Sequence, residues 1–187
     1  EYVREINLAA VKLARELADE YTAKNPDKPR FVAGSVGPTN KTCSMSPDVN
    51  NPAYRALTYD ELAAAYQQQM EAMLEGGVDA ILIETIFDTL NAKTAIFAAE
   101  QAMKVTGVEV PVMLSVTVSD VGGRTLSGQT LDAFLASVQH ANIFSVGLNC
   151  SFGARQLKPF LEQLAVRAPY YISAYPNAGL PNSFGSY

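Results

Sequence analysis

The sequence has few of the side chains that bind structural metals or cross-link small secreted domains. It contains one histidine, His140, and two cysteines, Cys43 and Cys150, which are far apart along the chain. A disulfide framework is therefore excluded, and because no signal-peptide pattern precedes the cysteines, a reducing cytoplasm is the expected location. A zinc site built from this chain alone is disfavoured, because it needs three or four ligands at tight spacing.

Basic clusters and long apolar runs are also missing. Lysine and arginine number 14 against 19 acidic residues, a net charge of −5, and the densest basic pair is the separated Lys28 and Arg30. No basic stripe could release phosphate counterions, so nothing indicates a nucleic-acid partner. Apolar runs such as residues 80–83 fall far short of the roughly 18 residues that span a bilayer. We therefore expect a soluble protein without a membrane partner.

The composition is that of a globular protein, with 187 residues of which 48% are apolar and 18% charged. This length predicts one domain or part of one. The chain starts without methionine, and its first residues already have helical spacing, with no capping residue before Glu1. We expect it to begin inside an element, as a fragment would. The apolar positions of this first helix are Val3, Ile6, Ala10, Leu13, Leu17 and Tyr21.

Strand and helix patterns then alternate to the end of the chain. A Thr-x-x-Glu capping box at Thr58 opens one predicted helix, and Gly76 and Gly77 supply its stop. Asp88 is a plausible cap for the next helix, which ends before Gly107. Strands are predicted at residues 31–36, 78–84, 110–118, 144–148 and 170–175, and the later helices at 130–140 and 154–167.

These strands are continuously apolar, which predicts burial on both faces and hence a parallel sheet covered by helices. A dinucleotide-binding sheet is rejected, because Gly34 and Gly37 do not form the required glycine-rich turn. In a (β/α)8 barrel, active residues lie at the carboxyl ends of strands. Polar residues stand at those ends here, namely Gly37-Pro38, Glu84, Thr117, Asn149-Cys150 and Pro176-Asn177.

Five strands cannot close a barrel of eight, so about one strand is expected to be missing before the chain and two after it. The predicted fold class is therefore α/β, a partial TIM barrel of about five parallel strands with outer helices. Residues 1–187 form a single incomplete domain in this interpretation. The open sheet edges predict self-association of the fragment.

The residues alone leave the candidate site open. Cys150 is either a small buried apolar residue or a ligand, and Glu84 either forms a salt bridge or recognises a substrate ammonium group. Asp88 is interpreted as a helix cap and Asn177 as a turn former. Cys43 is interpreted as structural, and His140 as a favourable charge at a helix end.

Several motifs together closely resemble the homocysteine-binding barrel of cobalamin-dependent methionine synthases. The resemblance covers nearly the whole chain from Arg30 onwards, in the same order. It is carried by residues 32–40 (VAGSVGPTN), 46–50 (SPDVN), 81–92 (ILIETIFDTLNA), 124–130 (RTLSGQT), 147–150 (GLNC) and 176–184 (PNAGLPNSF).

The resemblance implies a methyltransferase that converts homocysteine to methionine. It implies that Cys150 is the first of three zinc thiolates, the other two lying beyond Tyr187, and that Asn177 is a displaceable oxygen ligand. Glu84 would hold the homocysteine amino group, and Asn149 and Gly37 would also bind substrate. Cobalamin and methyltetrahydrofolate would bind to other domains of the same polypeptide.

Three alternatives remain open at this stage. The fragment could be inactive, because it supplies one thiolate of three. The parent could be a homocysteine methyltransferase of the betaine or S-methylmethionine type, although Gly37-Pro38-Thr39-Asn40 and residues 176–184 resemble the cobalamin-dependent branch. An unrelated barrel lyase could use Glu84 as a general base, but it would need a phosphate or carboxylate clamp that the sequence does not offer.

Overall fold

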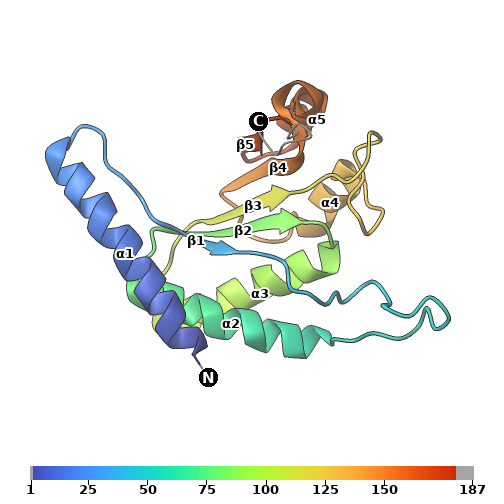
Figure 1. Ribbon diagram of the computed structural model, residues 1–187, viewed down its shortest axis with the longest axis horizontal. Helices are drawn as coiled ribbons and strands as arrows, with labels where there is room; N and C mark the ends of the chain where they lie inside the picture. The colour runs from blue at the N-terminus through green and yellow to red at the C-terminus, as the bar shows by residue number, and fades with distance from the viewer. Residues whose placement is uncertain (1, 180–187) are drawn as a thin grey trace, which may run out of the picture.

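A five-stranded parallel sheet in the order β1-β2-β3-β4-β5 organises the chain. The computed structural model (Figure 1) describes residues 2–179. Within them the expected α/β architecture of a partial barrel is confirmed, with each strand adjacent to the next strand in the chain. The elements are α1 (Val3–Lys24), β1 (Ala33–Val36), α2 (Tyr59–Gly76), β2 (Ala80–Ile86), α3 (Thr89–Thr106), β3 (Val112–Val116), α4 (Leu131–Val138), β4 (Ser145–Gly153), α5 (Ala154–Arg167) and β5 (Tyr171–Asn177).

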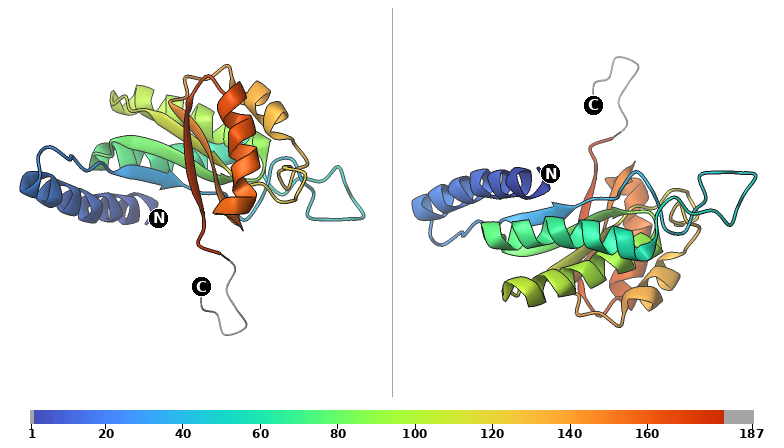
Figure 2. Two further views of the ribbon diagram at one scale, coloured as in Figure 1. Left: turned by 90° about the horizontal axis from the view of Figure 1, so that it is seen from above. Right: turned by 90° about the horizontal axis from the view of Figure 1, so that it is seen from below.

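Helices cover one face of the sheet. In Figures 1 and 2, α2 and α3 lie side by side beneath β1, β2 and β3, and α5 lies against β4 and β5. The packed face of α3 is rich in small side chains, and Ala95, Ala98, Ala99 and Ala102 are all fully buried. Small side chains allow helix backbones to approach closely. No helix in residues 2–179 has the length and apolarity needed to cross a membrane.

The opposite, concave face of the sheet is partly open. The strand directions turn progressively from β1 to β5, as Figure 2 shows. Residues of β1 and β2 that face the helices are buried, whereas those between them are exposed or half-buried. The prediction of burial on both faces is wrong for these two strands, because only five strands line the concave face across the described residues.

Local signals placed the helix ends correctly. Thr58 and Glu61 form both hydrogen bonds of the predicted capping box. Asp88 caps α3 by accepting from the N–H groups of Leu90 and Asn91, and Gly77 and Gly107 end their helices in the left-handed conformation. By contrast, β4 extends five residues beyond the predicted end at residue 148, because its backbone bulges between Asn149 and Gly153.

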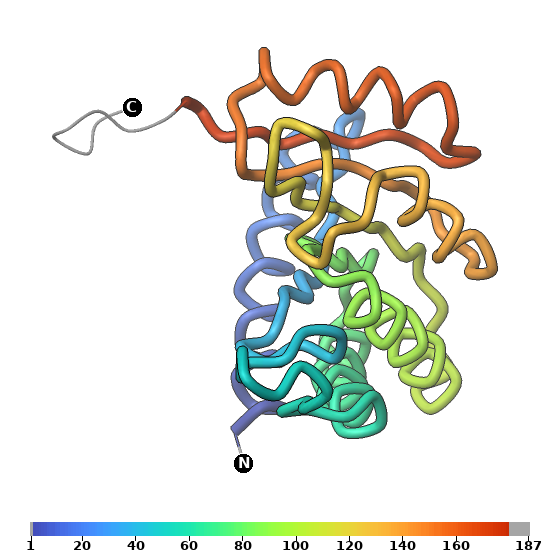
Figure 3. The backbone as a smooth tube through the Cα atoms, turned by 90° about the vertical axis from the view of Figure 1, so that its right-hand side faces the viewer, coloured from blue at the N-terminus to red at the C-terminus, as the bar shows by residue number. Residues whose placement is uncertain are grey.

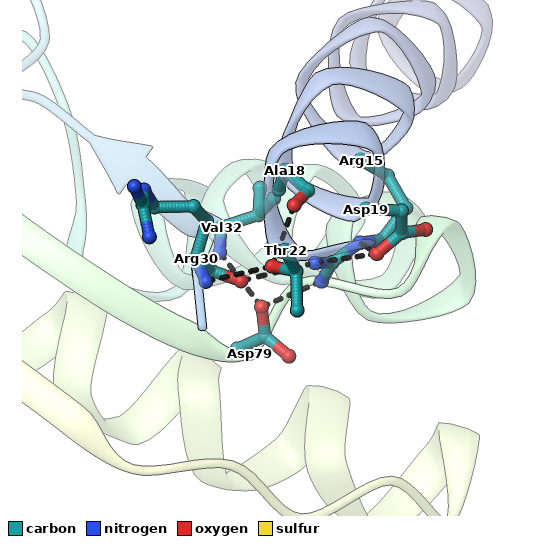
Figure 4. Close-up of polar contacts among 7 residues, drawn as sticks. All are labelled: Arg15, Ala18, Asp19, Thr22, Arg30, Val32 and Asp79. Carbon is teal, nitrogen blue, oxygen red and sulfur yellow. Dashed lines mark hydrogen bonds and ion pairs between the residues drawn. The ribbon is translucent and has the colours of Figure 1, made fainter. Parts of the chain in front are cut away.

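Helix α1 is fastened to the sheet by an ionic contact rather than by its apolar stripe (Figure 4). The Arg15 guanidinium lies 2.6 Å from the Asp79 carboxylate, which also accepts the Val32 N–H at 2.7 Å. Desolvation by burial raises the pKa of the Asp79 carboxyl, but the two donors outweigh it, so the net effect is a lowered pKa. The stripe predicted from the sequence is exposed, with Ile6 and Leu13 each at 66%. Val11 and Ala18 are the buried residues of α1.

Candidate functional site

The carboxyl ends of the strands and two loops form one edge of the sheet, and the two loops lie toward the viewer in Figure 3. Residues 37–58 form the longer loop, after β1, and residues 117–130 form the other, after β3. The parallel topology places the predicted site residues Gly37, Glu84, Asn149, Cys150 and Asn177 at this edge. In barrel enzymes this edge carries the active site.

The longer loop is attached to the start of α3. Asp88 is 2% exposed and accepts hydrogen bonds from the Ser44 N–H, at 3.3 Å, and from the Ser44 hydroxyl. The Cys43 N–H donates to Asn91 Oδ1 at 2.8 Å. Cys43 itself is buried, and burial raises the pKa of its thiol, which supports the structural interpretation of this cysteine. These contacts fix the loop close to the end of β2.

The second loop contains the Arg124 to Thr130 motif, which forms a small antiparallel bridge between those two residues. The Ser127 N–H donates to the Phe87 carbonyl at 3.1 Å, and Thr89 pairs with Gln129 at 3.0 Å. The loop is therefore tied to the turn between β2 and α3. Both loops thus converge on the residues that follow Glu84.

Glu84 is half-buried on the concave face at the end of β2. Its carboxylate accepts the Ser35 hydroxyl of β1 and the Tyr175 hydroxyl of β5, the latter at 2.8 Å. None of the ion pairs among residues 2–179 includes Glu84, so the salt-bridge interpretation finds no partner there. Within these residues, two neutral donors orient the carboxylate and no cation pairs with it.

Tyr175 reaches the Glu84 carboxylate from β5, and its hydroxyl donates to that carboxylate. Burial raises the pKa of its phenol, the Ser115 hydroxyl lowers it, and the Glu84 carboxylate raises it further, with a net upward shift. Tyr175 is therefore a hydrogen-bond donor at neutral pH. Ser115 in turn donates to Asn149 Oδ1 at 2.6 Å.

Cys150 follows Asn149 in the bulge of β4 and is half-buried. Its backbone has a φ of 57°, and the next residue, Ser151, has the same value. Asn149 Nδ2 donates to Cys150 Sγ at 3.0 Å. The Asn149 side chain is 1% exposed, so a buried amide supports a thiol that reaches the edge of the sheet.

Gly37 and Asn177 complete the set of predicted site residues. The Gly37 carbonyl accepts the Tyr66 hydroxyl at 3.1 Å, and a Cβ built on Gly37 would meet no atom within 4 Å. Burial raises the pKa of Tyr66 to about 12, so its phenol stays protonated. Asn177 is the last residue of β5, paired with Gly153 of β4, and its interpretation as a turn former is wrong.

A sequence profile of the family described as Homocysteine S-methyltransferase matches residues 1–187. The chain belongs to this family. Crystal structures of the homocysteine methyltransferase MmuM from Escherichia coli share its fold. The apo form has a TM-score of 0.73 at 24% identity over 94% of this chain and 61% of that one. The metallated form has a TM-score of 0.74 at 22% identity, over 94% and 59%. The chain thus spans about three fifths of the length of MmuM.

The metal-binding capacity of this chain is limited within residues 2–179. No group of three histidine, cysteine, aspartate or glutamate side chains there could hold a metal ion. The donor chemistry of Cys150 suits zinc, because the residue is a half-buried free cysteine and its sulfur has one N–H donor beside it. The described residues therefore offer one good ligand and not a complete site. Residues 180–184 of the last motif lie outside the described residues.

A large cleft lies at the opposite end of the sheet. It has a volume of about 840 Å³ and is lined by residues preceding β3, β4 and β5, together with the end of α3. Neither Glu84 nor Cys150 lines it. Because barrel chemistry occurs at the carboxyl ends of strands, cleft size alone does not identify the site.

Sequence reasoning missed four side chains that this site uses, namely Ser35, Thr85, Ser115 and Tyr175. Ser35 and Ser115 each interrupt an otherwise apolar strand. A single hydroxyl within such a strand is the sequence feature that could have marked both as site residues. Tyr175 stands directly before the Pro176-Asn177 pair that ends β5, but its sequence context does not reveal its partner. The sequence gives no sign of the role of Thr85. Its φ of 58° is rare for a β-branched residue, so a threonine at this position does not predict a bulge.

Proposed function

We propose that this chain forms the homocysteine-binding part of a methyltransferase, in which the homocysteine sulfur is methylated to give methionine. The observation that carries this proposal is the pairing of Glu84 and Cys150 at one edge of the sheet. Tyr175 holds the Glu84 carboxylate through one hydrogen bond, and the Asn149 amide, held by Ser115, supports the Cys150 sulfur through another. Homocysteine likewise has a cationic amino group and a thiol at separate positions.

Glu84 provides the recognition of the amino group in this proposal. Its half-buried carboxylate has no cationic partner within residues 2–179, and Ser35 and Tyr175 hold it in one orientation. An ammonium group would supply the missing charge, and hydrogen bonds between charged groups are stronger than neutral ones. The absence of a side chain at Gly37 leaves space beside the end of β1.

Cys150 supplies a zinc thiolate in this proposal, Asn177 supplies a displaceable oxygen, and the remaining ligands come from outside the described residues. A free thiol with a pKa of about 8.5 is mostly protonated at neutral pH. When bound, zinc would favour the thiolate form of homocysteine. The residues of this chain would hold the substrate amino group through Glu84 and the metal through Cys150 and Asn177.

The methyl donor in this proposal is methylcobalamin, carried with methyltetrahydrofolate on further domains of the same cytoplasmic polypeptide. Support comes from the Gly37-Pro38-Thr39-Asn40 motif at the end of β1. A donor of the betaine or S-methylmethionine type is the second candidate, because the family match fits it equally well. The 187 residues alone are proposed to be inactive, since the described part contains no complete metal site.

The test uses the complete polypeptide that contains this chain, with Cys150→Ala and the matched control Cys43→Ala. Zinc content is measured by elemental analysis, and methionine formation is assayed separately with methylcobalamin, betaine and S-methylmethionine. Cys150→Ala should lose zinc and methyl transfer, whereas Cys43→Ala should keep both. A Cys150→Ala enzyme with full zinc content and turnover would overturn the proposal. Activity with betaine or S-methylmethionine alone would replace the proposed donor.

A further inference from the structure

The Asn149 side chain occupies an unusual position between two bulges of the sheet. The pairing of β2 with β3 shifts between Ile83 and Ile86, and that of β4 with β5 shifts between Asn149 and Gly153. Each bulge contains a non-glycine residue with positive φ, Thr85 at 58° and Cys150 at 57°. Bulges of this kind re-aim side chains near active sites. Asn149 makes hydrogen bonds to residues in both.

All four hydrogen-bonding positions of the Asn149 amide are used. Oδ1 accepts from the Ser115 hydroxyl at 2.6 Å and from the Thr85 N–H at 3.3 Å. Nδ2 donates to Thr85 Oγ1 at 3.0 Å and to Cys150 Sγ at 3.0 Å. An amide has two acceptor and two donor positions, so none is free for a substrate. The sequence-based assignment of Asn149 to substrate contact is therefore not the role that this geometry favours.

The orientation of the amide is also fixed. The Thr85 N–H is a backbone group that can only donate, so it requires Oδ1 and not Nδ2 on its side. A flipped amide would bring two donors together in a site where Asn149 is 1% exposed, and an unpaired buried donor is costly. The N–H group must therefore point toward the sulfur of Cys150.

We propose that Asn149 is the positioning residue of Cys150, whose sulfur it directs toward the edge of the sheet by donating the hydrogen bond that a metal-bound thiolate accepts. Ser115 and Thr85 hold the amide in place for this purpose. The inference rests on the proposed function, in which Cys150 binds zinc. Groups that orient a metal ligand typically contribute 10- to 100-fold to metal affinity.

The decisive variant is Asn149→Asp in the complete polypeptide. Aspartate keeps the shape and the acceptor for Ser115 and Thr85, but it replaces the donor to sulfur by a second oxygen. Zinc affinity, measured by competition with a chelator, should fall about 10- to 100-fold. In the cobalt-substituted protein the sulfur-to-metal charge-transfer band should move to longer wavelength, because the sulfur electrons lose the stabilising N–H group.

Thr117→Val is the matched control, since the Thr117 hydroxyl donates to the main-chain carbonyl of Asn149 at 3.4 Å and not to its side chain. It should leave zinc affinity and the band position unchanged. If Asn149→Asp does not fold, Thr85→Val provides the second test, because it removes one acceptor of the amide and keeps the branched shape. A smaller loss of affinity with the same direction of band shift is expected for it.

The outcomes separate this inference from the proposed function. Cys150→Ala that retains zinc would refute both. Cys150→Ala that loses zinc, together with wild-type affinity and band position in Asn149→Asp and Thr85→Val, would refute the positioning role alone. A lower melting temperature without a change in affinity or spectrum would likewise reduce Asn149 to a structural residue.

Discussion

Replacing Glu84 by glutamine should weaken homocysteine binding in the complete polypeptide and leave zinc content unchanged. In the wild-type chain the Tyr175 hydroxyl lies 2.8 Å from Glu84 Oε2. Glutamine keeps an oxygen that can accept this hydroxyl, but it removes the charge that faces the substrate ammonium group. Hydrogen bonds involving charged groups contribute about 1.5 to 3 kcal/mol. Because Glu84 is only half-buried, we expect about 1.5 to 2 kcal/mol, or a 10- to 30-fold higher Kd.

Isothermal titration with homocysteine measures this change, and elemental analysis measures zinc in the same preparations. Glu109→Gln is a suitable control, because Glu109 is exposed and lines the cleft at the opposite end of the sheet. An unchanged Kd in Glu84→Gln would refute the assignment of this carboxylate to the amino group. Loss of zinc together with substrate affinity would show instead that Glu84 supports the metal site.

Three further predictions concern stability and association. Asp79→Asn should destabilise the chain in urea by about 1 kcal/mol, after allowance for solvent screening, through loss of the Arg15 ion pair. Folding lowers the pKa of Asp79. The difference in unfolding free energy between the wild type and Asp79→Asn should therefore reach its full size above about pH 4 and disappear as the pH falls through the lowered pKa. Gly147→Ala should cost about 3 kcal/mol, since its Cβ would lie 2.3 Å from the Ser173 carbonyl, whereas Gly37→Ala should cost far less. Light scattering should show self-association of the 187-residue chain, and a stable monomer at high concentration would contradict this.

Much of the fold follows from local sequence signals. The capping box at Thr58 and the glycine at position 77 specify helix ends by hydrogen bonds within a few residues, and both are present in the structure. The parallel order of the strands follows from their alternation with helices. The exposed stripe of α1 could not be predicted, because helical spacing shows which residues share a face and not whether another element covers it.

The site could be predicted only in part for a similar reason. Glu84 and Cys150 follow the buried runs of β2 and β4, and a parallel sheet necessarily brings such ends to one edge. The contacts that orient them join distant residues, with Asn149 lying 64 positions from Thr85 and 34 from Ser115. The bulges that make these contacts possible depend on strand register, which no short motif encodes.

The most direct test of the central claim is a crystal structure of the complete polypeptide with homocysteine bound. The account predicts that the amino group lies beside the Glu84 carboxylate and that the sulfur points toward the metal held by Cys150, at the carboxyl edge of the sheet. Homocysteine bound instead in the 840 Å³ cleft at the opposite end, or bound at the carboxyl edge without contact to either residue, would contradict it.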